Sequence, residues 1–263
     1  MSARRAASVS GGAAASRLSF IDFLDHRLRT TPPRQKGLRT RERLRIATAR
    51  VLDSKGYHAL RVTDIAAEAG VAEGSFYVYF KDKTEAALDV LTELLEEFLI
   101  QDVGLGTASE SPFAAIRHAN RRWLAFCRAN QGLMRGVLQV GDELPRFAKL
   151  VQQSNHHWYT HVAASVVKHH PAGSVSAEGA LLASYLLGTM MDEIARKLIV
   201  YQDRKFVMLL ASLRADDDAL ADAASVLWMR ALYPGWPLEG DLPHAAELLR
   251  NWPMPGGKRS AQN

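Results

Sequence analysis

Apolar residues recur along this chain at intervals of three and four, the spacing that places them on one face of an α-helix. In one stretch, Leu44, Ala47, Val51 and Leu52 share such a face, and Gly56 ends it. Strict alternation of apolar and polar residues, which marks a half-buried strand, never persists beyond four residues. The pattern therefore predicts an all-α protein without a sheet.

Glycine, proline and capping residues divide this periodic sequence into separate helices. The expected helices cover residues 16–29, the stretch before Gly56, the stretch before Gly70, and residues 72–78, 84–103, 112–128, 133–140, 145–169, 176–201, a short run from 203, 216–233 and 244–251. Residues 34–45 carry six arginine or lysine residues and one glutamate. We interpret them as a basic linker that leads into the next helix.

The positive charge of the chain is concentrated at its N-terminal end. Residues 1–83 carry 16 lysine and arginine residues against 8 acidic ones, whereas residues 84–263 carry 17 against 20. A basic segment on a mildly acidic body indicates a protein that docks one end on a polyanion, such as nucleic acid or a lipid surface. A solvated basic tail explains the charge equally well.

The most specific motif lies within this basic region, between residues 61 and 83. A helix-turn-helix needs a small residue inside its first helix, a turn residue that tolerates positive φ four positions later, and an apolar plug in its second helix. Ala66, Gly70 and Phe76 occupy these three positions. The spacing therefore predicts a helix-turn-helix with residues 72–78 as its second helix.

The sequence of the motif adds a second line of argument. Residues 65–71 are Ile-Ala-Ala-Glu-Ala-Gly-Val and residues 74–80 are Gly-Ser-Phe-Tyr-Val-Tyr-Phe, followed by Lys83 and Leu88. These residues resemble the DNA-binding signature of TetR-type transcriptional repressors. The aromatic run and the later Tyr233-Pro234-Gly235 also resemble, more weakly, the branch that contains the ethionamide-resistance repressor of mycobacteria. The resemblance implies a homodimer with a C-terminal domain that binds a ligand.

The resemblance also assigns roles within the motif. It implies that four residues face bases, namely Glu73, Gly74, Ser75 and Val78, and that Tyr77, Tyr79 and Lys83 contact phosphates. A phenol and an ammonium can each bind a phosphate oxygen, although both tyrosines would also suit a half-buried core. Arg61 stands where the family has a serine or threonine N-cap, so the cap is weaker or shifted and Arg61 can reach a phosphate instead. Thr63 completes the predicted DNA-binding set.

Large apolar and aromatic side chains are frequent between residues 111 and 201. Pockets for apolar ligands use aromatic and methionine side chains with few polar groups. A buried core uses the same residues, so both interpretations stay open. The predicted effector-binding residues are Trp123, Phe126, Leu138, Asn155, Trp158, Tyr159, Met190 and Met191, with Asp192 and Glu193 as further polar candidates.

Two late helices carry apolar surface broad enough to be buried on two sides. Leu182 and Leu186 belong to the helix from residue 176, and Ala224 and Trp228 to the helix from residue 216. Paired with their copies in a second chain, these helices would form the four-helix dimer interface that the resemblance implies. The core of a single-chain bundle would use the same residues.

Other constellations argue against an enzyme. His157 and His161 lie one helical turn apart in a histidine-rich helix, but no acidic residue of that helix lies near to complete a metal site, and none is predicted. No glycine-rich phosphate loop, nucleophile elbow or catalytic carboxylate pair is present, so no cofactor is expected. The single Cys127 excludes zinc sites of clustered thiolates and suits a reducing compartment.

Membrane insertion and export are not expected either. Charged residues interrupt the longest apolar stretch, and the first residues lack the leucine-rich middle of a signal peptide. We therefore expect a cytoplasmic protein without a membrane partner.

Together, these observations predict two functional parts with flanking extensions. Residues 1–38 form a basic extension with one short helix, 39–85 a three-helix DNA-binding domain with the helix-turn-helix, 86–235 a helical effector-binding and dimerisation domain, and 236–263 a Pro/Gly-rich tail. We expect a homodimeric repressor that binds a palindromic double-stranded DNA operator and is released by a small apolar effector. The rival interpretations are a helical, metal-dependent enzyme with a fortuitous motif and a ligand-independent DNA-binding protein.

Overall fold

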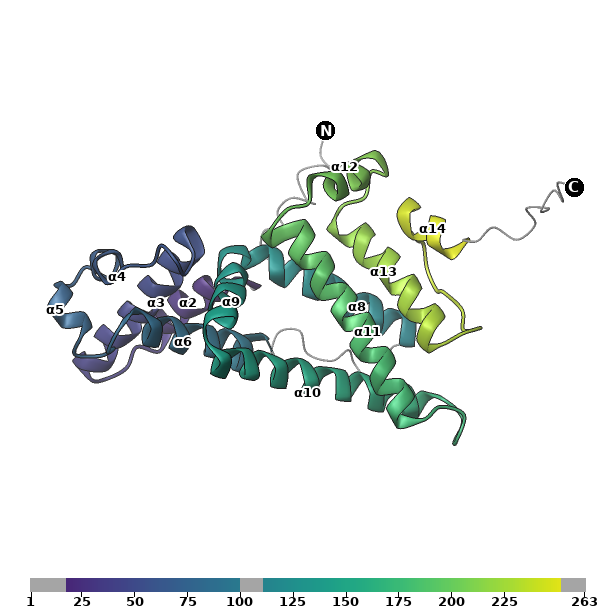
Figure 1. Cartoon of the computed structure of the whole chain (residues 1–263), viewed down its shortest axis with the longest axis horizontal. Helices are drawn as coiled ribbons and strands as arrows, with labels where there is room; N and C mark the ends of the chain where they lie inside the picture. The colour runs from purple at the N-terminus through teal and green to yellow at the C-terminus, as the bar shows by residue number, and fades with distance from the viewer. Residues whose placement is uncertain (1–17, 100–110, 252–263) are drawn as a thin grey trace, which may run out of the picture. The chain divides into compact units, whose positions relative to one another are not determined.

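The computed structural model describes residues 18–99 and 111–251, which form helices joined by short connections (Figure 1). In chain order these are α2 (Phe20–Thr30), α3 (Lys36–Lys55), α4 (Val62–Ala69), α5 (Glu73–Phe76), α6 (Lys83–Glu93), the π-helical turn η1 (Leu94–Phe98), α8 (Pro112–Ala129), α9 (Gln131–Glu143), α10 (Pro145–His169), α11 (Ala177–Ala195), the π-helical turn η2 (Arg196–Val200), α12 (Arg204–Ser212), α13 (Asp217–Leu232) and α14 (His244–Arg250). These two ranges contain no strand, so the all-α prediction is confirmed.

The chain divides into two compact units. Of the described residues, 18–99 and 125–158 belong to the first unit, and 111–124 and 159–251 belong to the second. None of the helices in the described ranges is both long and apolar enough to cross a lipid bilayer.

Several helices begin at residues whose side chains cap them. An oxygen of the capping side chain accepts a hydrogen bond from a free N–H of the first turn, which stabilises the helix start. The caps of α2, α6, α11, α12 and α13 are Ser19, Asp82, Ser176, Asp203 and Asp216. These short polar residues account for much of the agreement between predicted and observed helix starts.

The predicted basic linker at residues 34–45 is wrong, because α3 already begins at Lys36. Arg39 donates to two carbonyl groups of the preceding loop, at 3.2 and 3.0 Å, and so ties that loop to the first turns of α3. Repulsion among the arginines is relieved because Arg41 and Arg45 form ion pairs with Asp89 on α6. The partners of these charges lie far along the chain, so the local sequence looks too basic for a helix.

The N-terminal helix α2 packs into the core of the first unit. Phe20 and Leu24 are buried, and the Phe20 ring lies 5.4 Å from the ring of Phe98 in η1. The buried amide of Asn130 accepts a hydrogen bond from the N–H of Phe20 and donates one to the carbonyl of Leu18, both at 2.8 Å. Helix α2 is thus anchored by apolar contacts and by a buried amide at the junction of α8 and α9.

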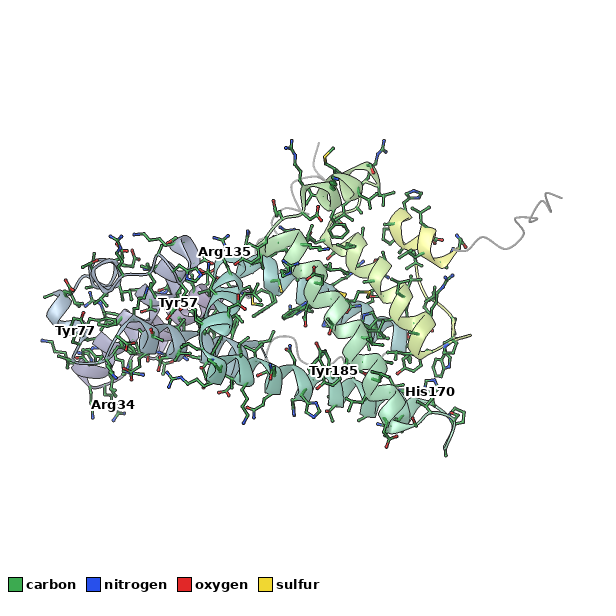
Figure 2. The ribbon with its side chains drawn as sticks, in the orientation of Figure 1. Arg34, Tyr57, Tyr77, Arg135, His170 and Tyr185 are labelled. Atoms are coloured by element: carbon green, nitrogen blue, oxygen red, sulfur yellow. The ribbon has the colours of Figure 1, made fainter. Side chains whose placement is uncertain are left out.

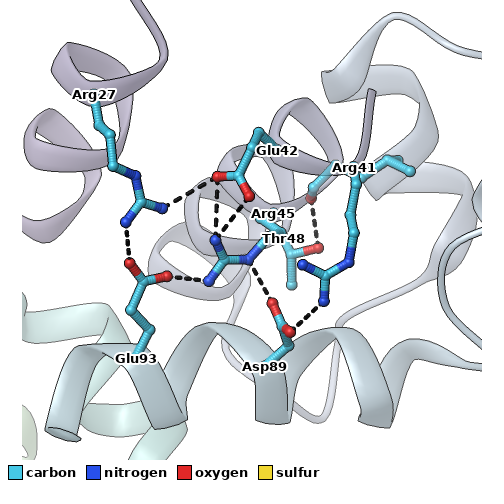
Figure 3. A network of polar contacts seen from close by, with 8 residues as sticks. Arg27, Arg41, Glu42, Arg45, Thr48, Asp89 and Glu93 are labelled. Atoms are coloured by element: carbon cyan, nitrogen blue, oxygen red, sulfur yellow. Dashed lines mark hydrogen bonds and ion pairs between the residues drawn. The ribbon is translucent and has the colours of Figure 1, made fainter. Parts of the chain in front are cut away.

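A network of ion pairs joins α2, α3 and α6 (Figure 3). Arg45 of α3, which is buried, pairs with Glu42, Asp89 and Glu93. Arg27 of α2 pairs with Glu93 and, at 3.1 Å, with Glu42. The carboxylate of Glu93, only 6% exposed, therefore lies between two guanidinium groups that come from different helices.

The charges of this network depend on one another. Burial by itself would lower the pKa of Arg45, but the carboxylates of Asp89, Glu93 and Glu42 raise it above its ordinary value, so the guanidinium stays charged. Removal of one partner from a buried ion pair leaves the other charge desolvated and without compensation. We therefore expect Arg45 to be critical for holding α2, α3 and α6 together.

The second unit is built around α13, which is buried along most of its length. The fully buried Asp222 accepts bidentate hydrogen bonds, at 2.6–2.7 Å, from Arg117 and Arg121 of α8. Burial raises the pKa of this carboxyl, but the two guanidinium groups outweigh burial and hold the pKa below its ordinary value. Another part of α13 is covered by α14 through a small apolar cluster of Ala223, Val226, Ala245 and Ala246.

We predict that Arg45→Met lowers the free energy of unfolding by about 3–5 kcal/mol, the usual cost of breaking a buried ion pair from one side. Arg50→Met is the matched control. Arg50 also lies on α3 and also pairs with two carboxylates, those of Asp25 and Glu68, but its side chain is 44% exposed. Its loss should cost at most about 1 kcal/mol. Urea unfolding followed by circular dichroism measures both values, and equal losses would contradict this description of the network.

Candidate nucleic-acid interface

Helices α4 and α5 are joined by a tight turn at Gly70. This residue has φ 64° and ψ 42°, the left-handed conformation that glycine adopts without a steric penalty. Its N–H bonds to the carbonyl of Ala67 at 3.1 Å, and the N–H of Val71 bonds to the carbonyl of Ala66 at 3.0 Å. These bonds satisfy the last carbonyl groups of α4 and reverse the chain toward α5. The predicted helix-turn-helix is present in the structure.

The inner side of the motif is apolar and closely packed. The rings of Phe76 and Phe80 lie 5.6 Å apart, and both side chains are buried. Ile65, Ala66 and Ala69 of α4 are also buried. This core fixes the orientation of α5, so the side chains on its other side have a defined direction.

The other side of α5 and the turn after it are open to solvent. Tyr77, beside α5 in Figure 2, is 55% exposed and Val78 is 75% exposed. Glu73 and Gly74 are exposed, and no atom lies within 4 Å of the position that a Cβ on Gly74 would take. Ser75 is half-buried. The structure thus excludes the alternative in which Tyr77 is a core residue.

Helix α5 is shorter than predicted. It covers Glu73–Phe76, and the chain continues from Tyr77 as a turn in which the N–H groups of Tyr79 and Phe80 both bond to the carbonyl of Phe76. The predicted DNA-binding residues at 77–79 therefore lie on this turn and not on the helix itself.

Tyr79 lies beside the first turn of α3. A Cβ built on Gly37 would be 3.6 Å from the hydroxyl oxygen of Tyr79, which is half-buried. This contact brings the exposed Lys36, next in the chain to Gly37, near the turn after α5. This side of the surface could not be predicted from the sequence, because residues 34–45 look like a basic linker.

Lys83 is held against Tyr57. Its ammonium lies 5.2 Å from the centre of the Tyr57 ring and 3.5 Å from the Tyr57 carbonyl oxygen, while the Tyr57 hydroxyl lies 3.0 Å from Oγ1 of Thr84. Lys83 is consequently half-buried and positioned at the start of α6. Tyr57 was not among the predicted site residues. The signal in the sequence was a tyrosine directly after Gly56, the glycine that ends the preceding helix.

Arg61 occupies the N-cap of α4 and its side chain makes no capping hydrogen bond, so the predicted weak cap is confirmed. Arg61 and Thr63 are both exposed at this end of α4.

Much of the N-terminal positive charge is used inside the first unit. Arg43 donates to the carbonyl of Ala69 at 2.5 Å and so caps the end of α4. The basic side chains in ion pairs are Arg27, Arg41, Arg45, Arg50 and Lys55. Within the part of this region that the structure describes, the exposed basic side chains without an ion pair are Arg29, Arg34, Lys36, Arg39, Arg43, Arg61 and Lys81. The charge available for a polyanion is therefore smaller than the sequence suggests.

The eight predicted effector-binding residues fall into both units. Phe126, Leu138, Asn155 and Trp158 belong to the first unit, and Trp123, Tyr159, Met190 and Met191 belong to the second. Phe126 is fully buried with its ring 6.1 Å from the ring of Phe98, which is the environment of a core residue. Tyr159 of α10 donates a hydrogen bond to Asp192 of α11 at 3.1 Å, so the structure brings these two candidates together.

Two clefts lie on the first unit, next to its ion pairs. None of the eight predicted effector-binding residues lines either cleft. The larger, about 680 Å³, lies over the network of Arg27, Arg45 and Glu93. Across the described ranges, no group of three or more histidine, cysteine, aspartate or glutamate side chains is arranged to hold a metal ion.

Comparison with known proteins identifies the helix-turn-helix region. Residues 45–89 match the family model "Bacterial regulatory proteins, tetR family". Among curated proteins, the chain is 28% identical over 128 residues to the "Uncharacterized HTH-type transcriptional regulator YuxN" of Bacillus subtilis (strain 168), a match that covers 45% of this chain and 43% of that protein. The chain spans less than half the length of the curated relatives that it matches.

Solved structures resemble a larger part of the chain. A TetR-like transcriptional regulator from Rhodococcus sp. RHA1 superposes with a TM-score of 0.56 at 19% identity, covering 73% of this chain and 95% of that one. The fatty acid degradation regulator FadR from Bacillus halodurans gives a TM-score of 0.52 at 18% identity, covering 73% and 94%. At such low identity these likenesses concern the fold.

We predict that Gly70→Ala lowers the free energy of unfolding by about 1–2 kcal/mol, because alanine in the left-handed region carries a steric penalty of that size. The added methyl would also lie 3.1 Å from the guanidinium of Arg43. Gly74→Ala is the matched control, because its position is open and helical; it should leave stability unchanged or raise it by up to about 1 kcal/mol. Thermal unfolding of both variants tests the turn, and a neutral Gly70→Ala would count against it.

Proposed function

The chain belongs to the TetR family of helix-turn-helix transcriptional regulators, a family of DNA-binding proteins rather than enzymes, and from this premise we propose that it is a ligand-responsive repressor. Family membership sets aside the rival interpretation of an enzyme with a fortuitous motif. The comparisons identify the family but not a branch within it. The resemblance to the branch of the ethionamide-resistance repressor therefore stays a prediction. We further propose that the protein acts on double-stranded DNA in the cytoplasm.

One observation supports the DNA-binding proposal most strongly: Glu73 and Gly74 of α5 and Val78 of the following turn are exposed, while Phe76 on the other side of α5 is buried. We propose that Glu73, Gly74, Ser75 and Val78 face the edges of bases. The small residues Gly74 and Ser75 allow close approach to the groove, and a carboxylate such as that of Glu73 can accept a hydrogen bond from cytosine N4. The buried aromatic core behind α5 supports this role because it limits the movement of the helix.

Phosphate contacts would flank this reading surface. We propose that Tyr77, Tyr79 and Lys83 bind phosphate oxygens, because hydroxyl and ammonium groups do so without reading sequence. Lys83 lies in the first turn of α6, where the helix dipole also attracts an anion. The exposed Arg61 and Thr63 would add contacts from the start of α4, and Lys36 from the first turn of α3.

We propose that two copies of the chain bind a palindromic operator, since a two-fold dimer presents two identical motifs. On α11, Leu182 and Leu186 are 62% and 66% exposed and offer an apolar face to a second copy. On α13, by contrast, Ala224 and Trp228 are already buried within the chain. This supports α11 as the main contributor and assigns α13 a smaller share than the sequence suggested.

The regulatory part of the proposal is a population shift. An effector that binds the C-terminal region more tightly in the conformation unfit for DNA must weaken DNA binding by the same coupling free energy. Tyr159, with its hydrogen bond to Asp192, is the candidate effector residue with the most specific surroundings. A ligand-independent DNA-binding protein, the remaining rival, would show no such coupling to any ligand.

Selection of bound fragments from random duplex DNA, followed by fluorescence anisotropy, tests the function. We predict that Tyr77→Phe weakens binding to the selected duplex and to random duplex by the same factor, about fivefold for the loss of one neutral hydrogen bond. Tyr201→Phe, at a tyrosine of the second unit that is also half exposed, is the control and should bind normally. A changed sequence preference in Tyr77→Phe, or an equal loss in the control, would refute the phosphate role.

We predict the opposite signature for Glu73→Gln. If Glu73 accepts a hydrogen bond from a base, then repeating the selection with this variant should change the preferred base at one position in each half-site. The Tyr77→Phe selection serves as the comparison, because it should return the wild-type sequence. An unaltered preference in Glu73→Gln would remove Glu73 from the base-reading set.

A further inference from the structure

Two adjacent acidic residues of α11 have very different surroundings. Glu193 forms a bidentate pair with Arg196 at 2.6–2.7 Å and lies 3.5 Å from Lys197, all on the exposed side of the helix. Asp192 is only partly exposed, and its carboxylate accepts a hydrogen bond from Tyr159 at 3.1 Å. No lysine, arginine or histidine among residues 18–99 and 111–251 pairs with it. Among the described residues, the charge of Asp192 thus has no cationic partner.

The environment of Asp192 opposes its charge. Burial raises the pKa of its carboxyl to about 6, and the hydrogen bond from Tyr159 offsets this only in part. A carboxylate with this pKa is still largely ionised at neutral pH. Burial of an ionised carboxylate without a cationic partner lowers the stability of the folded protein. Groups with such perturbed pKa values cluster at functional sites.

Two aromatic rings accompany this carboxylate. The Tyr159 ring lies 4.6 Å from the ring of Tyr185, which is 37% exposed and belongs to α11 (Figure 2). The ring of Tyr159 packs directly against the backbone at Gly188. A Cβ at position 188 would lie only 2.0 Å from Cε1 of Tyr159. Because only glycine permits this approach, Tyr159 is held in place on α11 with its hydroxyl directed at Asp192.

We propose that Asp192, Tyr159 and Tyr185 form the recognition end of the effector site and that the effector is an organic cation, an ammonium group attached to an apolar body. This inference rests on the proposed ligand response and specifies the chemistry of its ligand. The ammonium group would supply the positive counter-charge that Asp192 does not find among the described residues, and aromatic rings attract a cation through their faces. A bare metal ion is a poor match, because a single carboxylate next to phenol rings offers too few hard ligands.

The inference departs from the simple apolar effector that the sequence suggests. The two aromatic rings also suit an apolar body, since pockets for apolar ligands are lined by aromatic side chains. The charged end of the ligand would then be selected by Asp192, and the body by its apolar surroundings.

Three probes with the same ten-carbon chain separate charge from hydrophobicity. Decyltrimethylammonium, decanol and decanoate are titrated into the full-length protein below their micelle concentrations, at pH 7.5, and binding is followed by calorimetry. The ammonium should bind at least tenfold more tightly than decanol and decanoate. Equal affinities for the three, tighter binding of decanoate, or no ammonium binding at millimolar concentration would overturn the inference. These comparisons use the wild-type protein and need no variant.

Two matched substitutions test whether the carboxylate of Asp192 is the group that binds the ammonium. Asp192→Asn should weaken ammonium binding at least tenfold and leave decanol binding unchanged, because the amide keeps the shape and removes the charge. Glu193→Gln, one residue along, should bind the ammonium normally. Equal losses in both variants would indicate a general effect of negative charge and would contradict the site. Melting temperatures of both variants confirm that each is folded.

A DNA-binding measurement separates the two proposals. If the selected duplex binds but the ammonium does not, the cation site is wrong while the DNA-binding function stands. If no duplex binds, the proposed function fails whatever the ligand does. An ammonium that binds through Asp192 without weakening DNA binding would support the site and refute its role as an effector site.

Discussion

The buried carboxylate of Glu93, held between the guanidinium groups of Arg27 and Arg45, is the interaction on which the first unit depends. Three helices meet at this point, and none can move away without leaving a desolvated charge behind. The constraint extends to α5 through Arg41, which pairs with Asp89 and lies 5.2 Å from the centre of the Phe80 ring. Phe80 packs on Phe76 of α5. The proposed DNA-reading helix α5 is therefore supported by Phe80, whose neighbour Arg41 is fixed by its ion pair with Asp89.

The same network explains which parts of the fold could be predicted from the sequence. Periodicity and capping residues located the helices because those signals are local, and Gly70 marked the turn for the same reason. The start of α3 was missed because Arg41 and Arg45 find their partners 44–48 residues further along the chain. A local window of sequence shows only unbalanced positive charge there, so the segment looks like a linker.

The candidate sites divide in the same way. Val78 was predictable as a surface residue from its place in the motif, whereas the sequence left Tyr77 open between a surface and a core position. The support that Tyr57 gives Lys83 depends on a contact across 26 residues. For the effector region, composition cannot separate core from pocket. Phe126 proves to be a core residue. Asp192 stands out only in three dimensions, where no lysine or arginine of the described ranges pairs with its buried carboxylate.

Amide hydrogen exchange of the full-length protein, with and without a selected DNA duplex, tests the central claim most directly. If α4, α5 and the adjoining turn form the DNA-binding surface, then DNA should slow exchange across residues 61–83 and in the first turn of α3. Exchange in α13 and α14 should be unchanged, because both helices belong to the second unit and lie outside the proposed DNA-binding surface. Protection confined to the second unit, or unaltered exchange across residues 61–83, would contradict the account.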